Sequence, residues 1–432
     1  MKTDVRTTAQ TRMAKRVAVA AAAAVGIATA ATAQASAAPD FYATPESLPS
    51  APGELVRSEP AALAVRVPGT AGGFPADATR IMYRTADAND VPIAVTGTYL
   101  DPQVPWTGAG ERPLVSLAVG THGQGDQCAP SKQFERLVTI DGHLAPMLEY
   151  EAIAVNTLLL RGIAVVVTDY EGLGTAGIHT YVNRVSEAHA VVDAARAAQS
   201  LPDTAITRNG PVGFWGYSQG GGAAAAAAEL APTYAPELDV KGTYAGAPPA
   251  DLTATLREID GSALTGAVGY AINSLVQAYP QLRPTIDAEV NDRGREMLAR
   301  VAEQCVAETA AAFGFQRTSD HTRTGEPLAV VLDRLPLAKD LLDRQRIGRL
   351  TPSAPVLVQS GIHDDIVPFG QARQLAADWC SRGATVQFSE NALPELGPGL
   401  AVNHAAPLLL GLPEAAQFLT DRFNGVPTGG NC

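Results

Sequence analysis

Short apolar runs alternate with longer amphipathic stretches along most of this chain, and the alternation predicts a sheet flanked by helices. Strands are predicted at PLVSLAVG (113–120), IAVVVTDY (163–170), VKGTYAGAPP (240–249), APVLVQSG (354–361) and ATVQFSE (384–390). The near-continuous apolar character of 163–170 is typical of a parallel strand that helices cover on both faces. A helical period runs through 183–201. This order of strands and helices favours an α/β fold with a doubly wound, mostly parallel sheet.

Three segments depart from this rhythm. Residues 38–60 are rich in proline and predict an irregular arm on the surface, and 78–102 contains two β-like runs split by TADAND, which signals a hairpin. The stretch from about 252 to 345 has helical character, many charges and no convincing strand. A pair of long covering helices would be the simpler explanation, but about ninety residues is too long for that. An insertion between late strands would lie over the carboxyl edge of the sheet, so we predict a helical cap there.

The first 37 residues are typical of a secretory signal peptide. Positive charges at Lys2, Arg6, Arg12, Lys15 and Arg16 precede the small apolar run VAVAAAAAVGIATAATA, and Ala35-Ser36-Ala37 offers a cleavage site. A membrane anchor is the alternative, but the run is rich in alanine and ends in a cleavage pattern. We therefore expect export, cleavage near Ala37 and a catalytic domain over 38–432.

Removal of the leader would make the mature chain more acidic than the full sequence. The formal net charge is −12, and loss of five basic residues and one acidic residue with the leader gives −12 − 4 = −16 for the mature chain. A chain this acidic predicts no basic patch, so nucleic acid is not expected as a partner.

The stretch GFWGYSQGG, residues 213–221, carries the pattern G-x-S-x-G at Gly216, Ser218 and Gly220. The pattern alone should occur by chance in on the order of one chain in ten with this many glycines. Here, however, an apolar run precedes it and the helix former QGGGAAAAAAELAP follows it. A serine on such a strand-to-helix turn is the nucleophile elbow of α/β-hydrolases, and Ser218 is the predicted nucleophile.

A serine nucleophile needs a base and an acidic residue, which follow it in that fold in the order acid, then histidine. Asp364 comes directly after the strand that ends at Gly361, although a solvated turn would also favour aspartate. His404 is the only one of seven histidines downstream of Asp364, with a helix-cap histidine as the alternative. His363 and Asp365 are neighbours of the acid, but adjacent side chains in an extended segment point in opposite directions.

An oxyanion hole needs N–H donors aimed at the developing charge. The amide of Gln219, directly after the nucleophile, is the first expected donor. The glycine-rich loop GTHGQGDQC (120–128) follows an early strand, and Gly123 or one of its neighbours is our candidate for the second. An ordinary turn could have the same glycine-rich sequence.

Four cysteines allow three pairings, and an oxidising compartment predicts two disulfides. We expect Cys128–Cys305, which would pin the cap beside the oxyanion loop, and Cys380–Cys432, which would tie the tail to the last layer of the sheet. No C-x-x-C occurs, so neither a zinc cluster nor a thioredoxin-like centre is expected.

The motifs GYSQGG, DYEGLG (169–174), CAPS (128–131), YAPEL (234–238) and DDIVPF (364–369) together resemble the secretory lipase family, the lipase A type of α/β-hydrolase. The resemblance runs from about residue 40 to the end. It implies an exported hydrolase of ester bonds with a helical cap over an acyl-binding tunnel, and it assigns the nucleophile to Ser218, the acid to Asp364 and the base to His404. The lipase A type is thought to use an acidic side chain in the oxyanion loop, and GTHGQG has none before Asp126. This departure favours backbone amides as donors and esterase over long-chain lipase activity.

The resulting hypothesis is a secreted serine hydrolase that cleaves carboxylic esters, acylglycerols above all, through an acyl-enzyme. It requires no metal or cofactor, takes a lipid or other ester as substrate, contacts a lipid–water interface transiently and has no obligate protein partner. A peptidase or amidase on the same fold and a non-catalytic binding protein are the alternatives.

Overall fold

A nine-stranded sheet organises the part of the chain that the computed structural model describes, residues 40–64, 75–136, 138–140 and 146–431. In the order in which they lie side by side, the strands are β1 (Leu55–Ala61), β2 (Ala76–Ala86), β3 (Pro92–Pro102), β7 (Ala164–Thr168), β4 (Leu114–Ala118), β8 (Val212–Tyr217), β9 (Val240–Gly246), β10 (Val356–Gly361) and β11 (Val386–Asn391). The six strands from β7 to β11 in this order are parallel, and β1, β2 and β3 pair in antiparallel fashion. The predicted doubly wound, mostly parallel sheet is confirmed. A separate small hairpin joins β5 (Val138–Ile140) and β6 (Pro146–Leu148).

The start of the sheet corrects one prediction. Residues 38–60 were expected to form an irregular surface arm, but Leu55–Ala61 is the edge strand β1, paired with β2. Pro60 is tolerated because an edge strand has one row of unpaired N–H groups. The arm also inserts Phe41, which packs on Met82 and Ala94. The irregular sequence of β1 gave no strand signal because most of its residues stay partly exposed.

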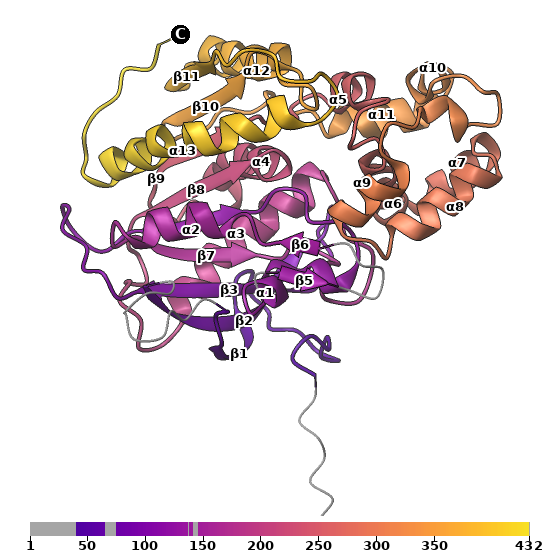
Figure 1. The fold of residues 1–432 in the computed structure, drawn as a ribbon. Coiled ribbons are helices and arrows are strands. Elements are labelled where there is room, and N and C mark those ends of the chain that lie inside the picture. The colour runs from indigo at the N-terminus through magenta and orange to yellow at the C-terminus, as the bar shows by residue number, and fades with distance from the viewer. Residues whose placement is uncertain (1–39, 65–74, 137, 141–145, 432) are drawn as a thin grey trace, which may run out of the picture. The chain divides into compact units, whose positions relative to one another are not determined.

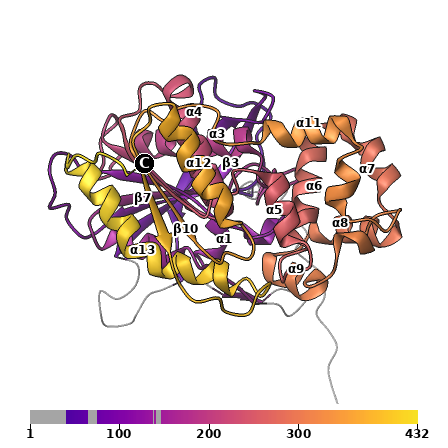
Figure 2. The ribbon, with the colours of Figure 1, turned by 90° about the horizontal axis from the view of Figure 1, so that it is seen from above.

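Helices cover both faces of the sheet (Figures 1 and 2). On one face lie α2 (Ala152–Leu159) and α13 (Val402–Phe423), which contact each other. The opposite face carries α3 (Arg184–Ser200), α4 (Gln219–Tyr234) and α12 (Phe369–Ser381), where Trp379 of α12 donates a hydrogen bond to Glu229 of α4. The alanines of α4, from Ala223 to Ala228, are all buried between α3 and the sheet. Small side chains suit this position because they let the helix approach the strands closely.

The stretch between β9 and β10 is helical, as predicted. It contains α5 (Leu252–Ile259), α6 (Ala267–Ala278), α7 (Arg283–Glu289), α8 (Asp292–Val301), α9 (Val306–Phe313), α10 (Leu328–Leu332) and α11 (Pro336–Arg344). Figures 1 and 2 show these helices gathered beside one end of the sheet. We call them the inserted helices. They belong to the same compact unit as the sheet, Phe41–Cys432.

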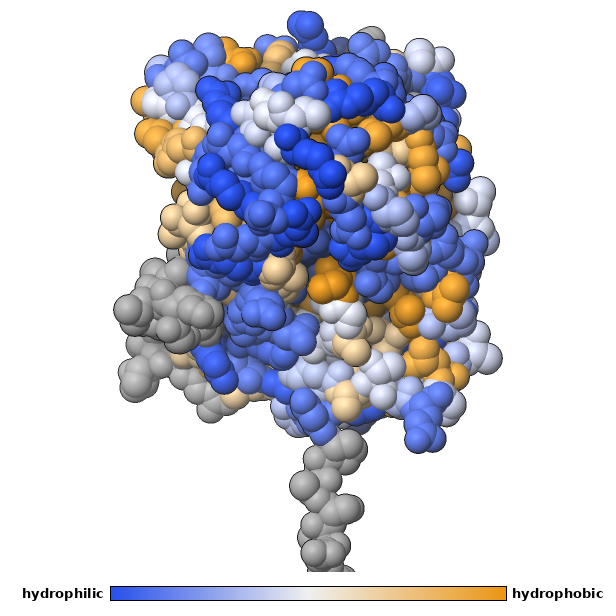
Figure 3. All heavy atoms as spheres, turned by 90° about the vertical axis from the view of Figure 1, so that its right-hand side faces the viewer, coloured by the Kyte–Doolittle hydropathy of each residue, from blue (hydrophilic) through white to orange (hydrophobic). Residues whose placement is uncertain are grey.

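The outward face of the inserted helices is largely hydrophilic, with hydrophobic side chains scattered over it (Figure 3). Phe315, Val330 and Leu337 are among the large apolar side chains exposed in this part of the chain. None of the helices in the described residues combines the length and the apolar character needed to span a bilayer.

Candidate active site

Ser218 occupies a strained turn between β8 and α4. Its backbone has φ 58° and ψ −124°, a region that residues other than glycine rarely adopt. The turn is tight because a Cβ on Gly216 would overlap the Gly220 carbonyl, and a Cβ on Gly220 would overlap the carbonyl of Ala118 in β4. This conformation lifts the Ser218 side chain out of the sheet edge, as the elbow motif predicts.

His404 joins Ser218 to Asp364. Its Nε2 lies 2.8 Å from Ser218 Oγ, and its Nδ1 lies 2.8 Å from Asp364 Oδ2. Asp364 follows β10 and accepts further hydrogen bonds from the N–H groups of Ile366 and Val367. The structure therefore brings together, in the predicted order, three residues that are up to 186 positions apart in the sequence.

Several contacts fix His404, the predicted base. His404 lies in the first turn of α13, and its backbone carbonyl accepts a hydrogen bond from the hydroxyl of Tyr217, the residue before Ser218. Burial of the ring opposes protonation, but the Asp364 carboxylate and its hydrogen bond outweigh burial and raise the pKa of His404. A higher pKa makes Nε2 a stronger acceptor for the serine proton.

His363 and Asp365, the neighbours of Asp364 in the sequence, have different surroundings from Asp364. His363 is exposed. Asp365 is buried, and its Oδ2 accepts a hydrogen bond of 3.1 Å from the N–H of Ala401, just before α13. Asp365 therefore supports the start of the helix that carries His404, while Asp364 contacts the ring itself.

Gln219 begins α4, so its N–H lies at the positive end of the helix dipole. Its side-chain amide donates to Glu187 Oε1 at 2.7 Å and to His179 Nε2 at 2.9 Å. Burial raises the pKa of Glu187 to about 8 and lowers the pKa of His179 to about 4, so the imidazole is neutral and can accept. Glu187 and His179, which sequence reasoning missed, fix the side chain of the residue that follows Ser218.

The loop after β4 meets the site through Thr121 rather than Gly123. Thr121 lines the same cavity as Ser218 and Gln219. Gly123 has φ 125° and packs so closely on Gln304 and Cys305 that a Cβ would overlap their backbone. The glycine is needed for that contact, and Gly123 is not among the residues that line the cavity. Thr121 is therefore the residue of this loop that shares the cavity wall with Ser218, and a donor at Gly123 stays a prediction.

A buried polar network stands behind this loop. Glu149 Oε2 lies 3.1 Å from His122 Nε2, the Tyr150 hydroxyl donates to the Thr121 carbonyl, and Glu151 accepts from the Gly120 N–H. Burial would lower the pKa of His122, but Glu149 outweighs it and raises that pKa to about 9. Sequence reasoning could not find this network, because periodicity does not reveal that Glu149 and Glu151 are buried on either side of the partly buried Tyr150.

Two of the sequence motifs meet away from Ser218. Asp169 of DYEGLG is fully buried and accepts hydrogen bonds from the Ser131 N–H of CAPS at 2.8 Å and from Thr96 at 2.7 Å. Asp126, the first carboxylate in the stretch after β4, accepts a hydrogen bond from the Gly174 N–H. These motifs hold loops together, and Asp126 does not line the cavity.

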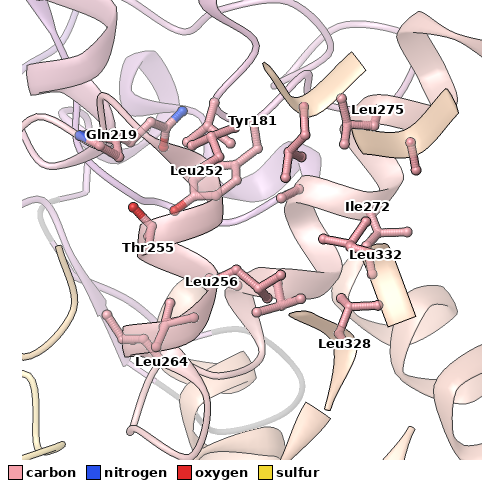
Figure 4. Close-up of a pocket in the computed structure, with 18 of the residues that line it drawn as sticks. Tyr181, Gln219, Leu252, Thr255, Leu256, Leu264, Ile272, Leu275, Leu328 and Leu332 are labelled. Carbon is pink, nitrogen blue, oxygen red and sulfur yellow. The ribbon is translucent and has the colours of Figure 1, made fainter. Parts of the chain in front are cut away.

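An apolar cavity extends from Ser218 and Gln219 into the inserted helices (Figure 4). Figure 4 shows Gln219 and Tyr181 at one side, and Ile272, Leu328 and Leu332 at the other. Side chains from α5, α6 and α10 supply much of its wall. Few polar groups face it, so the cavity suits a hydrocarbon chain.

The disulfide Cys128–Cys305 is present and confirms the first predicted pairing. It joins the stretch after β4 to the residue before α9, with a Cα–Cα distance of 5.5 Å. Cys432 lies outside the described residues, so its pairing with Cys380 stays a prediction. Within the described part of the chain, no group of three or more His, Cys, Asp or Glu side chains is arranged to hold a metal ion.

Comparison with known proteins places this site in context. A family model described as secretory lipase matches residues 143–431. A probable inactive lipase of Mycobacterium tuberculosis is 30% identical over 90% of this chain and 82% of its own length. A secreted triacylglycerol lipase of Malassezia restricta is 29% identical over 81% and 72% of the two chains.

Solved structures share the fold. Lipase A of Candida antarctica in its closed state superposes with a TM-score of 0.74 at 22% identity, over 91% of this chain and 87% of that one. The rice cell wall degrading esterase LipA from Xanthomonas oryzae gives a TM-score of 0.67 at 22% identity, over 86% and 98%. Both are ester hydrolases by name.

Proposed function

Because the chain belongs to the secretory lipase family, we propose that it is a secreted serine hydrolase that cleaves carboxylic esters, acylglycerols above all. One observation carries the proposal. The hydrogen-bonded row from Ser218 through His404 to Asp364 lies beside an apolar cavity. Family membership supports ester hydrolysis in general, and the apolar lining favours acyl chains among the esters.

The proposed reaction begins with attack by Ser218 Oγ on the ester carbonyl. His404 Nε2 accepts the serine proton, while Asp364 holds the Nδ1–H and stabilises the imidazolium that forms. The Gln219 N–H donates to the carbonyl oxygen as it becomes negative. His404 then returns the proton to the leaving alcohol, and the acyl group remains on Ser218.

Water completes the cycle. His404 Nε2 accepts a proton from water as its oxygen attacks the acyl-enzyme, and the same donors stabilise the second oxyanion. Proton return to Ser218 Oγ releases the carboxylic acid. The first and the last of the four proton transfers use the 2.8 Å contact between His404 Nε2 and Ser218 Oγ, and the other two use the same ring nitrogen.

We assign the acyl chain to the apolar cavity and the role of a cap to the inserted helices. Ile272 of α6 and Leu332 of α10 lie on its side away from Gln219 (Figure 4). Each methylene that leaves water contributes about 0.8 kcal/mol of transfer free energy, so longer acyl chains should bind more tightly until the cavity is filled. The disulfide Cys128–Cys305 supports this role because it attaches the inserted helices beside the site.

Hydrolysis rates on p-nitrophenyl esters of rising chain length test the function and the assignment together. We expect Ile272→Trp to lower kcat/KM for long-chain esters by at least about tenfold, because the indole fills the part of the cavity that holds the chain end. Acetate and butyrate esters should be hydrolysed at nearly the wild-type rate. Gln277→Trp, at an exposed position of the same helix, is the matched control.

Two results would count against these proposals. A wild-type protein that hydrolyses no ester of the series would exclude ester hydrolysis as its function. Equal losses for short and long esters in Ile272→Trp, with normal rates in Gln277→Trp, would show that the acyl chain lies elsewhere.

A non-catalytic binding protein remains the second candidate, because one relative is named a probable inactive lipase. The complete row of Ser218, His404 and Asp364 argues against it, since a silent protein has no need of this geometry. A peptidase or amidase would use the same three residues. Turnover of p-nitrophenyl esters against the matching anilides separates the three candidates.

We also propose that the protein is exported, cleaved near Ala37 and closed by a second disulfide, Cys380–Cys432. Peptide mass spectrometry of non-reduced protein from the culture medium should find a first residue near Ala38 and these two cysteines in one linked pair. The second bridge would contribute roughly 3–5 kcal/mol to the free energy of unfolding if it is unstrained. A chain that still begins at Met1, or another partner for Cys380, would contradict the proposal.

A further inference from the structure

Most backbone N–H and C=O groups of the loop after β4 have hydrogen-bond partners within the protein. The Gly120 N–H donates to Glu151 at 2.8 Å, the Gly120 carbonyl lies 2.9 Å from His122 Nδ1, and the Thr121 carbonyl accepts from the Tyr150 hydroxyl at 3.0 Å. Among the described residues, the N–H groups of Thr121, His122 and Gly123 have no hydrogen-bond acceptor, and Thr121 is the one of these three residues that lines the cavity. Because polar backbone groups in folded proteins are nearly always paired, an uncommitted donor beside a nucleophile indicates a ligand.

The Thr121 side chain also faces the cavity and has one hydrogen-bond partner there. Thr121 is the one residue of the fully described loop 120–125 that lines the cavity with Ser218 and Gln219. Its Oγ1 lies 2.9 Å from the hydroxyl of Tyr181, which also lines the cavity. The loop itself lies against the elbow, since Gly220 abuts the carbonyls of Ala118 and Val119.

Tyr181 is held firmly enough to orient a neighbour. Its ring packs edge-on against Tyr270, with centroids 5.5 Å apart, and against His179 at 6.1 Å. Burial raises the pKa of Tyr181 to about 12, so the phenol keeps its proton at neutral pH. The protonated phenol can therefore donate to Thr121 Oγ1, which leaves the threonine proton free.

We propose that the Thr121 hydroxyl, oriented by Tyr181, donates to the oxyanion together with the Gln219 N–H. This inference rests on the proposed hydrolysis at Ser218. The hydrogen bonds run in one direction, from Tyr181 O–H to Thr121 O–H to the oxyanion, and such a row strengthens each member. A bond to a charged oxygen is stronger than one to the neutral ester carbonyl, so the contact favours the transition state. Thr121 acts as a catalytic residue and Tyr181 as a positioning residue.

Thr121→Val tests this role because valine has nearly the shape of threonine and keeps the backbone N–H. We expect kcat for p-nitrophenyl butyrate to fall by about 10²-fold, the usual effect of losing one oxyanion donor, with KM within about threefold of wild type. Thr121→Ser should restore most of the rate, and Tyr181→Phe should lower kcat about tenfold without changing KM. Thr98→Val is the control, since Thr98 is buried in β3 and its hydroxyl has no partner among the described residues.

The outcomes separate the two proposals. If the wild type is active and depends on Ser218 while Thr121→Val keeps its kcat, the inference about Thr121 is wrong and the proposed function stands. The same holds if Thr121→Ser is as slow as Thr121→Val. If Thr121→Val does not unfold cooperatively, Tyr181→Phe decides, and an unchanged kcat in it overturns the inference. A wild type without esterase activity would overturn both.

Discussion

Replacing Ser218 with alanine is expected to lower kcat for ester hydrolysis by about 10⁶-fold, the size of effect found when the nucleophile of a serine hydrolase is removed. The hydroxyl is the only group in the site with both the base at 2.8 Å and access to the cavity. The half-buried Ser218 side chain is small, so its loss leaves no large void, and the thermal midpoint should stay close to that of wild type. Assays with p-nitrophenyl butyrate measure the loss of turnover, and thermal unfolding measures the midpoint. A fluorophosphonate should label the wild type and leave Ser218→Ala unlabelled.

Ser360→Ala is the matched control for this experiment. Ser360 is fully buried in β10, and its hydroxyl has no partner among the described residues. Its removal should change neither turnover nor labelling. Wild-type turnover in Ser218→Ala would end the proposal that this serine is the nucleophile, whatever the protein's activity proved to be.

The second large effect is expected at the base and the acid. His404→Ala and Asp364→Asn should each lower kcat by about 10⁴-fold or more. Without the ring, no group takes the serine proton. An asparagine in place of Asp364 offers no charge to the imidazolium and removes the main cause of the raised pKa of His404.

His363→Ala and Asp365→Asn are the controls that the chain itself supplies, and each should cost about tenfold or less. His363 is exposed, and an asparagine at 365 can still accept from the Ala401 N–H. If His363→Ala proved as slow as His404→Ala, or Asp365→Asn slower than Asp364→Asn, the base or the acid would be wrongly assigned. Steady-state rates of all four variants on one ester decide the matter.

Sequence periodicity predicted the elements that are regular over their whole length. The hairpin of β2 and β3, the parallel strands and α3 could all be read from local patterns, because burial on one or both faces imposes a period on the residues. Edge strand β1 could not, since it has a proline and mostly partly exposed side chains. Its strand character comes from pairing with β2, which no local pattern encodes.

The candidate site also contains residues that the sequence could predict and residues that it could not. Ser218, Asp364 and His404 were predictable because the fold requires them in a fixed order after recognisable strands. Glu187, His179 and Glu149 were not, because each acts through burial beside residues distant in the sequence. Gly123 as an oxyanion donor stays a prediction. The structure adds a reason for a glycine there that the sequence could not show, because a Cβ would overlap the backbone of Cys305, a residue 305 − 123 = 182 positions further along the chain.

The Tyr217 hydrogen bond to the His404 carbonyl has a consequence for how this enzyme could diversify. It ties the strand of the nucleophile to the helix of the base, and Asp364 follows a strand of the same sheet. The side chains that we propose to react thus belong to the sheet and its own helices, whereas most of the cavity wall comes from one contiguous insertion, Leu252–Arg344. Under the proposed function, mutations accumulating in that insertion would change which acyl chains fit while Ser218, His404 and Asp364 stay in place.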